Sequence, residues 1–502
     1  MLDRSFDCDV LIVGLGPAGA TLAALLGRHG ISVIACDTST VVYPLPRAAH
    51  FDHEIMRIFQ DLGLADEVLE HARPAGVYEF RSASGETLIE IPDMSQIMDV
   101  SGWPRSFMFN QPGVEHALRR HLEKLASVTV RLGHSFIDLR ETAAGVEARV
   151  ADHDGQSYAV RARYLIGCDG GRSTVRDAIG GALESFEFDE PWLVIDAIPR
   201  SLAGLPKGNL QLCDPARPTT CVQMGPGRHR WEFMLLPGES AEAVLEDAFV
   251  DRLLEKWGAE IEIERKAVYR FHALLASRWR KGPVLLAGDS AHQMPPFAGQ
   301  GMCSGIRDAA NLAWKLAMVI KGRAADALLD SYQEERAPNV RAYIELAIGM
   351  GRVVCMIDPA AARERDGQLL AALAAGTPAL PPLDPPPLTG AAILSATQGA
   401  GEIFPQPVVL VDGLRHGLDD ALGEGIWLIG EGGVPELPGV LGVSLDDDRL
   451  QPFRPALAKW LGARSAAAVL VRPDRYVFGT GNARFLAEAW LVAIGSGAPV
   501  AA

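Results

Sequence analysis

The chain has 502 residues, of which 48% are hydrophobic and 22% are charged, and its formal net charge at pH 7 is −16. That length predicts two or three domains. The negative charge argues against nucleic acid or an anionic membrane as a partner, because phosphate surfaces repel it. No apolar segment reaches the roughly 18 residues that a membrane span needs. Seven scattered cysteines with no C-x-x-C pair are typical of a reduced, cytoplasmic protein.

The chain begins with the pattern of a βαβ unit. Residues 9–14 form a short apolar run rich in β-branched residues, which predicts a buried parallel strand. An Ala- and Leu-rich segment up to residue 29 predicts a helix, and residues 31–36 predict a second strand. The order strand, glycines, helix, strand is the context in which a glycine motif binds a dinucleotide.

That motif is Gly14-x-Gly16-x-x-Gly19. In it, Gly14 would allow a tight turn, Gly16 the approach of a pyrophosphate, and Gly19 close packing of helix on strand. The N-terminus of the helix offers unpaired N–H groups and a partial positive charge to phosphates. Asp37 ends the second strand, where an acid accepts ribose hydroxyls. The motif alone leaves open whether the dinucleotide is FAD or NAD.

Two further motifs follow predicted strands. In the stretch 284–301, Gly288-Asp289 ends a strand, and Asp289 could accept hydrogen bonds from a polyol. Pro295 and Pro296 stiffen the loop, and Gly299 and Gly301 precede a long predicted helix over 302–320. Asp169, within Cys-Asp-Gly-Gly-Arg-Ser, follows a predicted strand over 157–167, although a simple Asp-Gly turn has the same pattern.

The remaining patterns divide the chain. Residues 184–270 alternate apolar and polar residues between turns, which predicts an antiparallel sheet inserted into an α/β domain. A proline-dense stretch predicts a linker, because proline interrupts helices and central strands. We therefore predict a dinucleotide-binding domain over 1–183 and 276–375, an antiparallel-sheet substrate domain over 184–275, a linker over 376–390 and a small α/β domain over 391–502.

The three motifs, in this order and spacing, resemble those of group A FAD-dependent aromatic hydroxylases, the p-hydroxybenzoate hydroxylase-like class. The string GDSAHQMPPFAGQGMCSGIRDAANLAWKLA is especially similar to 3-(3-hydroxyphenyl)propionate hydroxylases and related polyketide hydroxylases, and the likeness extends over nearly the whole chain. It implies a Rossmann-like FAD-binding domain and a thioredoxin-like C-terminal domain. All seven cysteines precede residue 356, so that last domain has no redox dithiol.

The resemblance implies an NAD(P)H-dependent monooxygenase that hydroxylates a phenolic ring with O2 through a flavin C4a-hydroperoxide. It also implies that NADH or NADPH visits the site and leaves, and the lack of a second glycine motif for a resident nicotinamide agrees with this. The implied FAD-binding residues are Gly14, Gly16, Pro17, Ala18, Gly19, Asp37, Arg47, Gln111, Asp169, Asp289, Pro296, Gly299, Gly301 and Met302.

The sequence specifies the catalytic base and the substrate-binding residues less closely than the FAD site. Related phenol hydroxylases read R-A-D-G where this chain has Arg47-Ala48-Ala49-His50, so His50 replaces the acid as the candidate base, and a packing role is the competing interpretation. Inward residues of the predicted sheet and loop are candidates for substrate contact: Gln211, Gln223, Phe233 and Pro295. No metal ligand set is expected.

Three functions remain open from sequence. We expect hydroxylation of a small phenolic acid of the 3-(3-hydroxyphenyl)propionate type, and the alternative is tailoring of a polycyclic polyketide. A second alternative is a flavin-binding redox protein without hydroxylase turnover. A halogenase is disfavoured because no two tryptophans are spaced i, i+2. A homodimer is the oligomeric state that we expect.

Overall fold

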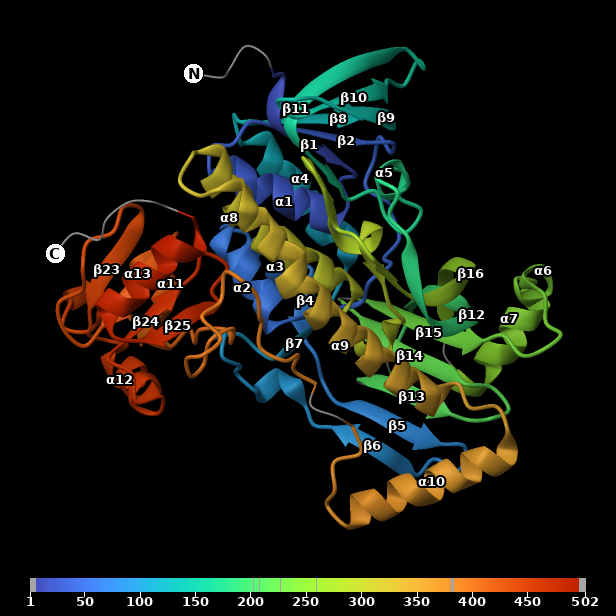
Figure 1. Ribbon diagram of the computed structural model, residues 1–502. Helices are drawn as coiled ribbons and strands as arrows, with labels where there is room; N and C mark the ends of the chain where they lie inside the picture. Colours follow the sequence, from blue (N-terminus) through green and yellow to red (C-terminus); the bar gives the residue numbers. More distant parts are fainter. Residues whose placement is uncertain are drawn as a thin grey trace.

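The computed structural model describes residues 6–495, apart from 202, 207, 226, 259, 381 and 382. Two eight-stranded sheets are the largest sheets in this part of the chain, and a four-stranded sheet lies in the C-terminal domain (Figure 1). The α/β class predicted from sequence is confirmed. No helix within the described ranges combines the length and hydropathy that crossing a bilayer requires.

The first large sheet contains the predicted βαβ unit. Strand β1 (Cys8–Val13) pairs in parallel with β2 (Val33–Asp37) and with β11 (Ser157–Gly167). Helix α1 (Pro17–Arg28) connects β1 to β2 and contacts the long helix α8 (Gly301–Ile320). The sheet order is β17-β18-β11-β1-β2-β8, and its other strands are β8 (Val128–Leu132), β9 (Ser135–Glu141), β10 (Val146–Ala151), β17 (Arg280–Lys281) and β18 (Val284–Leu286).

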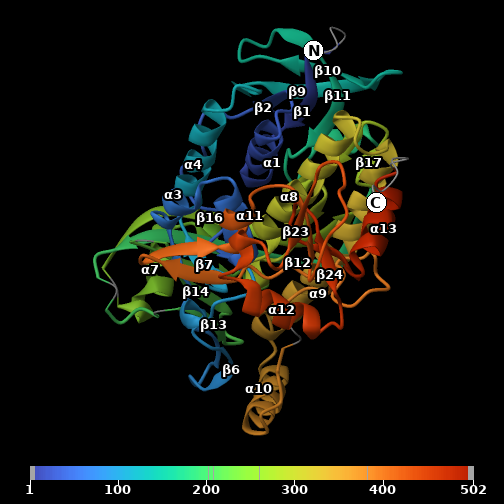
Figure 2. The same cartoon turned by 90° about the vertical axis from the view of Figure 1, so that its left-hand side faces the viewer.

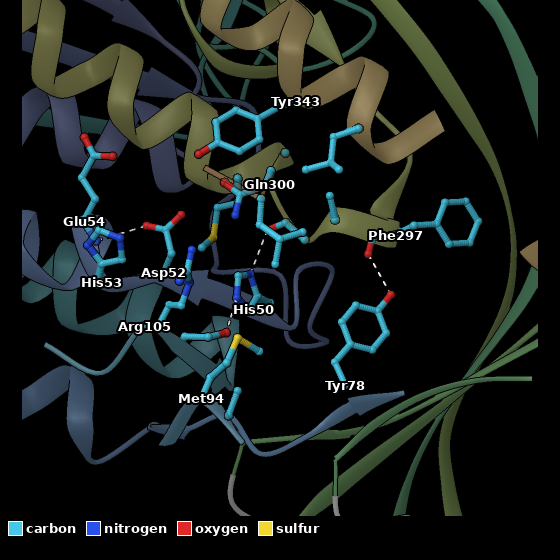
Figure 3. Close-up of a pocket in the computed structure, with 18 of the residues that line it drawn as sticks. His50, Asp52, His53, Glu54, Tyr78, Met94, Arg105, Phe297, Gln300 and Tyr343 are labelled. Atoms are coloured by element: carbon cyan, nitrogen blue, oxygen red, sulfur yellow. Dashed lines mark hydrogen bonds between the residues drawn. The ribbon is translucent and has the colours of Figure 1, made fainter. Parts of the chain in front are cut away.

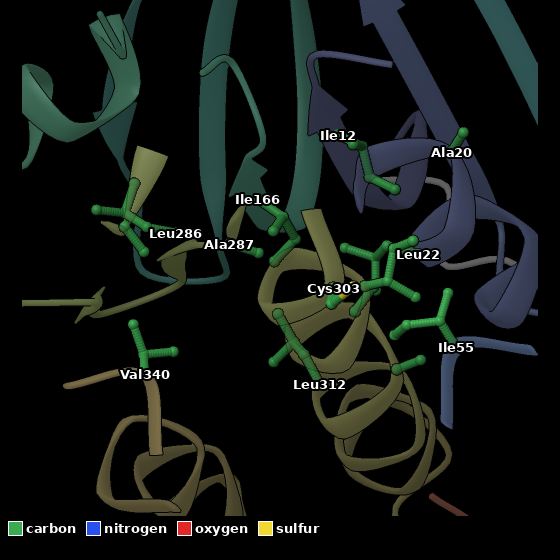
Figure 4. Packing of buried hydrophobic residues seen from close by; sticks show 14 of the residues in the cluster. Ile12, Ala20, Leu22, Ile55, Ile166, Leu286, Ala287, Cys303, Leu312 and Val340 are labelled. Carbon is green, nitrogen blue, oxygen red and sulfur yellow. The ribbon is translucent and has the colours of Figure 1, made fainter. Parts of the chain in front are cut away.

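This sheet and its helices share one hydrophobic core. Ile12 of β1, Leu22 of α1 and Ile166 of β11 are fully buried and pack toward Leu312 of α8 (Figure 4). Two backbones approach closely here, because a Cβ on Gly305 would lie 3.1 Å from the Cα of Gly288. Small residues at this crossing hold the Gly-Asp loop against α8, and that contact places the loop at the edge of the sheet.

The second large sheet has the order β19-β16-β12-β15-β14-β13-β5-β6. Two of its strands, β5 and β6, come from residues 78–91, within the segment predicted to belong wholly to the dinucleotide domain. That boundary is wrong, because β5 pairs in parallel with β13, far along the chain. The strands are β5 (Tyr78–Ser82), β6 (Thr87–Ile91), β12 (Leu183–Pro199), β13 (Asn209–Cys213), β14 (Thr219–Met224), β15 (Arg228–Met234), β16 (Ile261–Ala276) and β19 (His292–Gln293).

Between the two large sheets lies a small sheet that carries the candidate base. Its strands are β3 (His50–Asp52), β7 (Ser106–Phe109) and β4 (Ala72–Pro74), in the order β3-β7-β4. Helix α2 (His53–Asp61) continues directly from β3, and α4 (Gln111–Glu123) follows β7. Strand β3 is therefore fixed between a paired strand and a helix.

After α8, two helices lead to the C-terminal domain. Helix α9 (Ser331–Val354) contacts the second large sheet, and α10 (Pro359–Ala374) packs against β6 at one end of the molecule (Figure 1). The described residues of the proline-dense stretch 376–390 form neither helix nor strand, as that composition predicts.

The C-terminal domain is a four-stranded mixed sheet of order β23-β22-β24-β25. Its elements are β22 (Ile426–Gly430), β23 (Val440–Ser444), β24 (Ala468–Val471), β25 (Val477–Gly481), α11 (Leu418–Leu422), α12 (Arg454–Gly462) and α13 (Ala483–Ala493). Figure 2 shows this domain in front of α8 and α9. Arg57 of α2 donates to Asp419 of α11 at 2.7 Å, one of several buried ion pairs that join the domain to the rest of the chain.

The deepest of these pairs centres on Glu335 of α9. Arg472 donates to Glu335 at 2.8 Å and to Asp474 at 2.5 Å, and Lys315 donates to Glu335 at 2.8 Å. Burial raises the pKa of Glu335, but the charges of Arg472 and Lys315 outweigh burial and lower that pKa to about 2. Glu335 is therefore ionised at neutral pH, and the side chains of all four residues are buried.

Replacing Arg472 with Met should lower the free energy of unfolding by about 3–5 kcal/mol, because two buried carboxylates lose a partner. Urea unfolding followed by circular dichroism measures this. Arg449→Met is the control, since that arginine forms an exposed pair with Asp447 and should contribute no more than about 1 kcal/mol. Equal losses in both variants would show that the buried network does not stabilise the domain interface.

Candidate active site

The glycine motif forms an open cradle at the start of α1. Gly14 has φ +98°, and a Cβ there would lie 2.3 Å from the carbonyl oxygen of Cys168. A Cβ on Gly19 would lie 2.0 Å from the carbonyl oxygen of Gly14. A Cβ on Gly16 would meet no atom within 4 Å, so only this glycine borders empty space. The turn therefore fits a pyrophosphate placed beside Gly16 at the helix N-terminus, where Pro17 and Ala18 begin α1.

Two carboxylates flank this cradle. Asp37, at the end of β2, accepts hydrogen bonds from the N–H groups of Leu15 and Ser39, each at 2.7 Å. These bonds fix its carboxylate beside the glycine turn and leave lone pairs for ribose hydroxyls. Asp289 is exposed in the Gly-Asp loop and accepts no hydrogen bond from the described residues, so its carboxylate can bind a polyol. The donor set and the open space both fit FAD.

Asp169, which is predicted to contribute to FAD binding, organises its own loop beside the glycine turn. It accepts from the hydroxyl of Ser173 at 2.5 Å and from the N–H of Val175 at 3.1 Å, at the start of α5 (Thr174–Ala178). Both carboxylate oxygens thus organise the residues of its own loop. Gln111 is also a positioning residue, because its side-chain oxygen accepts from the N–H groups of Arg47 and Ala48.

Beside the N-terminus of α8 lies a cavity of about 500 Å³. Its walls come from β3 and its flanks, from the second large sheet and from the loop before α8 (Figure 3). Residues of the C-terminal domain complete the wall. The predicted residues that line it are Arg47, His50, Gln211, Pro296, Gly299, Gly301 and Met302. The structure brings these residues together from three separate segments, 47–50, 211 and 296–302.

Three predicted substrate contacts do not line this cavity. Phe233 is buried in a separate hydrophobic cluster with Leu193 and Trp231. Along β14, Thr220 and Val222 line the cavity, so Gln223 points to the opposite face, as alternation along a strand requires. Pro295 caps a short 3-10 turn, Pro296–Ala298, and does not line the cavity, although its neighbours Met294 and Pro296 do. These three assignments are corrected, whereas Gln211 faces the cavity.

His50 contacts two polar groups at the cavity wall. Its Nδ1 lies 3.1 Å from the carbonyl oxygen of Gly299, which can only accept, so Nδ1 carries the proton. Its Nε2 then accepts from the hydroxyl of Ser106, at 2.5 Å. Burial lowers the pKa of His50, although the charge of Asp52 opposes this effect, and the imidazole is neutral at pH 7. A neutral imidazole bonded to a hydroxyl in a cavity can accept a proton.

A buried charge network that the sequence did not predict lies behind His50. Arg307 of α8 pairs with Asp52 and with Glu54, and it donates to Gln300 at 2.9 Å. The hydroxyl of Tyr476, from the C-terminal domain, donates to Glu54 at 2.7 Å. Burial raises the pKa of Asp52, but Arg307 outweighs it and keeps that pKa far below its usual range. The titratable residues within 50–54 were the only sign of this network in the sequence, but Arg307, which pairs with two of them, lies on a distant helix.

Comparison with known proteins agrees with this geometry. Residues 7–347 match the FAD binding domain family, and the chain belongs to that family. A probable NADH-specific resorcinol 4-hydroxylase of Rhodococcus jostii (strain RHA1) is 39% identical over 494 residues, covering 94% of this chain and 91% of the relative. A 3-(3-hydroxy-phenyl)propionate/3-hydroxycinnamic acid hydroxylase of Mycobacterium sp. (strain JLS) is 36% identical over 517 residues, covering 94% and 89%.

Among solved structures, aklavinone-11 hydroxylase in complex with FAD and aklavinone superposes with a TM-score of 0.79 at 25% identity, covering 99% of this chain and all of that one. The flavin-dependent monooxygenase PieE superposes equally well, at 0.79 and 24% identity, and supports the fold. The prediction of an FAD-dependent aromatic-ring hydroxylase is therefore confirmed at the level of the family.

Proposed function

We propose that this protein hydroxylates a single-ring phenolic acid of the 3-(3-hydroxyphenyl)propionate type, using FAD, NADH and O2. The observation that carries the proposal is the cavity of about 500 Å³, which holds both the face of α8 expected to meet the flavin and the His50–Ser106 pair. Once an isoalloxazine ring lies against Gly299–Met302, the space that is left suits one aromatic ring better than a polycycle. The names of the relatives support both the phenolic substrate and NADH.

Bound FAD supplies the chemistry of hydride acceptance and of oxygen transfer to an electron-rich ring. The Gly16 turn and Asp37 hold its adenosine and pyrophosphate half, and Asp289 binds the polyol. The N–H groups of the first turn of α8 carry a partial positive charge at the inner end of the cavity.

The protein's own part in the reaction is to ionise the phenol. The substrate hydroxyl transfers its proton to the oxygen of Ser106 while the Ser106 proton passes to Nε2 of His50, which becomes an imidazolium. The resulting phenolate carries more electron density at its ortho and para carbons. Apolar side chains over the same cavity exclude water from this site. They are Met94, Met108, Val222, Phe297, Leu346 and Met350.

The proposal is tested by NADH oxidation with a panel of phenols, with product and hydrogen peroxide both quantified. The expected result is strong stimulation by 3-(3-hydroxyphenyl)propionate, weaker stimulation by resorcinol, and hydroxylated product in near-equal yield to NADH consumed. Stimulation only by polycyclic phenols would move the substrate assignment to the polyketide type. Peroxide without any hydroxylated product would leave a flavin-binding redox protein.

A further inference from the structure

Five arginines line the cavity, and they differ in their partners. Three of them pair with carboxylates: Arg105 with Asp99 and Asp384, Arg230 with Asp196, and Arg307 with Asp52 and Glu54. Arg47 has no carboxylate partner among the described residues, but it is exposed and stacks over the ring of Tyr43 at 4.7 Å. Arg73 is the remaining cation.

Within the part of the chain that the structure describes, Arg73 has no carboxylate partner. Its Nη2 donates to the carbonyl oxygen of Gln223 at 3.1 Å, and its Nε is buried without a hydrogen-bond partner. Burial lowers the pKa of Arg73, and no nearby acid opposes that effect. The surrounding wall is an apolar cluster of Ala75, Met108, Val222 and Met224. A half-buried guanidinium in such a place is costly unless an anion completes it.

The small sheet places Arg73 in line with the candidate base. His50 of β3 is the cross-strand partner of Met108 of β7, and Met108 is the partner of Arg73 of β4. Directly opposed residues point to the same face of a sheet, and all three residues line the cavity. Two strand spacings separate the backbones of His50 and Arg73 by about 10 Å. When a hydrogen bond to each of these two side chains is included, that distance suits a phenol ring with a short acidic side chain.

We propose that Arg73 binds the carboxylate of the substrate while the phenol hydroxyl lies at Ser106 and His50, so that Arg73 selects phenols with a short acidic side chain. This inference rests on the proposed function and specifies its substrate class. The planar guanidinium can grip a carboxylate with two parallel hydrogen bonds, which also fixes how far the ring enters the cavity. A phosphate of the visiting NADH is the other anion that could reach an arginine here.

The test compares an acid with its uncharged twin, 3-(3-hydroxyphenyl)propionate against 3-(3-hydroxyphenyl)propionamide, in FAD-loaded wild type, Arg73→Met and Arg73→Lys. In Arg73→Met, kcat/KM for the acid should fall about 100-fold, and that for the amide should change less than about threefold. Arg73→Lys should retain part of the preference for the acid over the amide, because lysine keeps the positive charge but cannot form the two parallel hydrogen bonds of a guanidinium. The dissociation constant of the acid, measured by calorimetry without NADH, should rise by a similar factor.

Arg105→Met is the matched control, since Asp99 and Asp384 already balance that cavity-lining charge. Its acid-to-amide ratio should stay near that of wild type. An equal loss of kcat/KM on the acid and the amide in Arg73→Met would overturn the inference. A rise confined to the KM for NADH would also overturn it and would assign Arg73 to binding of the nicotinamide dinucleotide. If the wild-type enzyme hydroxylates the acid and the amide equally well, the inference about Arg73 is wrong while the proposed function stands. If no phenol is hydroxylated, the calorimetric comparison still decides whether Arg73 binds the acid.

Discussion

Gly16→Val is expected to weaken FAD binding about 100-fold, or about 2.7 kcal/mol, while leaving the stability of the FAD-free protein close to that of wild type. Gly16 has φ −73°, which any residue adopts, and a Cβ at this position would meet no protein atom within 4 Å. The valine side chain would instead fill the space where the pyrophosphate fits. Fluorescence titration of the FAD-free protein with FAD, together with its thermal unfolding, measures both quantities.

Gly19→Ala is the contrasting variant. Its Cβ would lie 2.0 Å from the carbonyl oxygen of Gly14, so α1 must move away from β1. We expect this variant to lose stability and FAD affinity together. A Gly16→Val protein that binds FAD as tightly as wild type would show that the pyrophosphate lies elsewhere.

His50→Gln should lower the rate of hydroxylation by about 100- to 10,000-fold, the usual contribution of a positioned general base. Because burial holds the pKa of His50 below its ordinary value near 6.5, the neutral base is present at pH 7. The wild-type rate should therefore fall only as the pH drops through a value below 6.5, and this acid limb should be absent from His50→Gln. A pH profile of product formation measures the effect.

The choice of substrate distinguishes a catalytic role of His50 from a structural one. If His50 acts as the base, a phenol with electron-withdrawing substituents, already ionised at the assay pH, should recover much of the lost rate in His50→Gln. Ser106→Ala should show a smaller loss with the same substrate dependence, because His50 stays in place to accept the proton. Full turnover of His50→Gln at every pH would remove His50 from the mechanism.

The local features of the fold were predictable from sequence. The predicted strand over 157–167 coincides with β11, and the predicted helix over 302–320 begins one residue later than α8. These elements have continuous apolar runs and glycine boundaries, which are local signals. The membership of β5 and β6 in the second sheet was missed because it depends on pairing with β13, which no local pattern encodes.

The site was predictable where a motif fixes the backbone and not where it depends on the face of a strand. The glycine turn and the loop before α8 lie where the motifs placed them, whereas Phe233 and Gln223 point away from the cavity. Alternation shows that a strand has two faces, but only the tertiary structure shows which of them meets the cavity. Arg73 was missed for a related reason, since its alignment with His50 runs through Met108 on a third strand.

The reaction proposed for this protein is the transfer of oxygen from O2 to a phenolic ring. The most direct test is a reaction of the FAD-loaded protein with NADH and 3-(3-hydroxyphenyl)propionate under isotopically labelled dioxygen, with mass spectrometry of the product. We expect one labelled oxygen atom in each molecule of hydroxylated product and little peroxide. An unlabelled product, or NADH consumption that yields only peroxide, would contradict it.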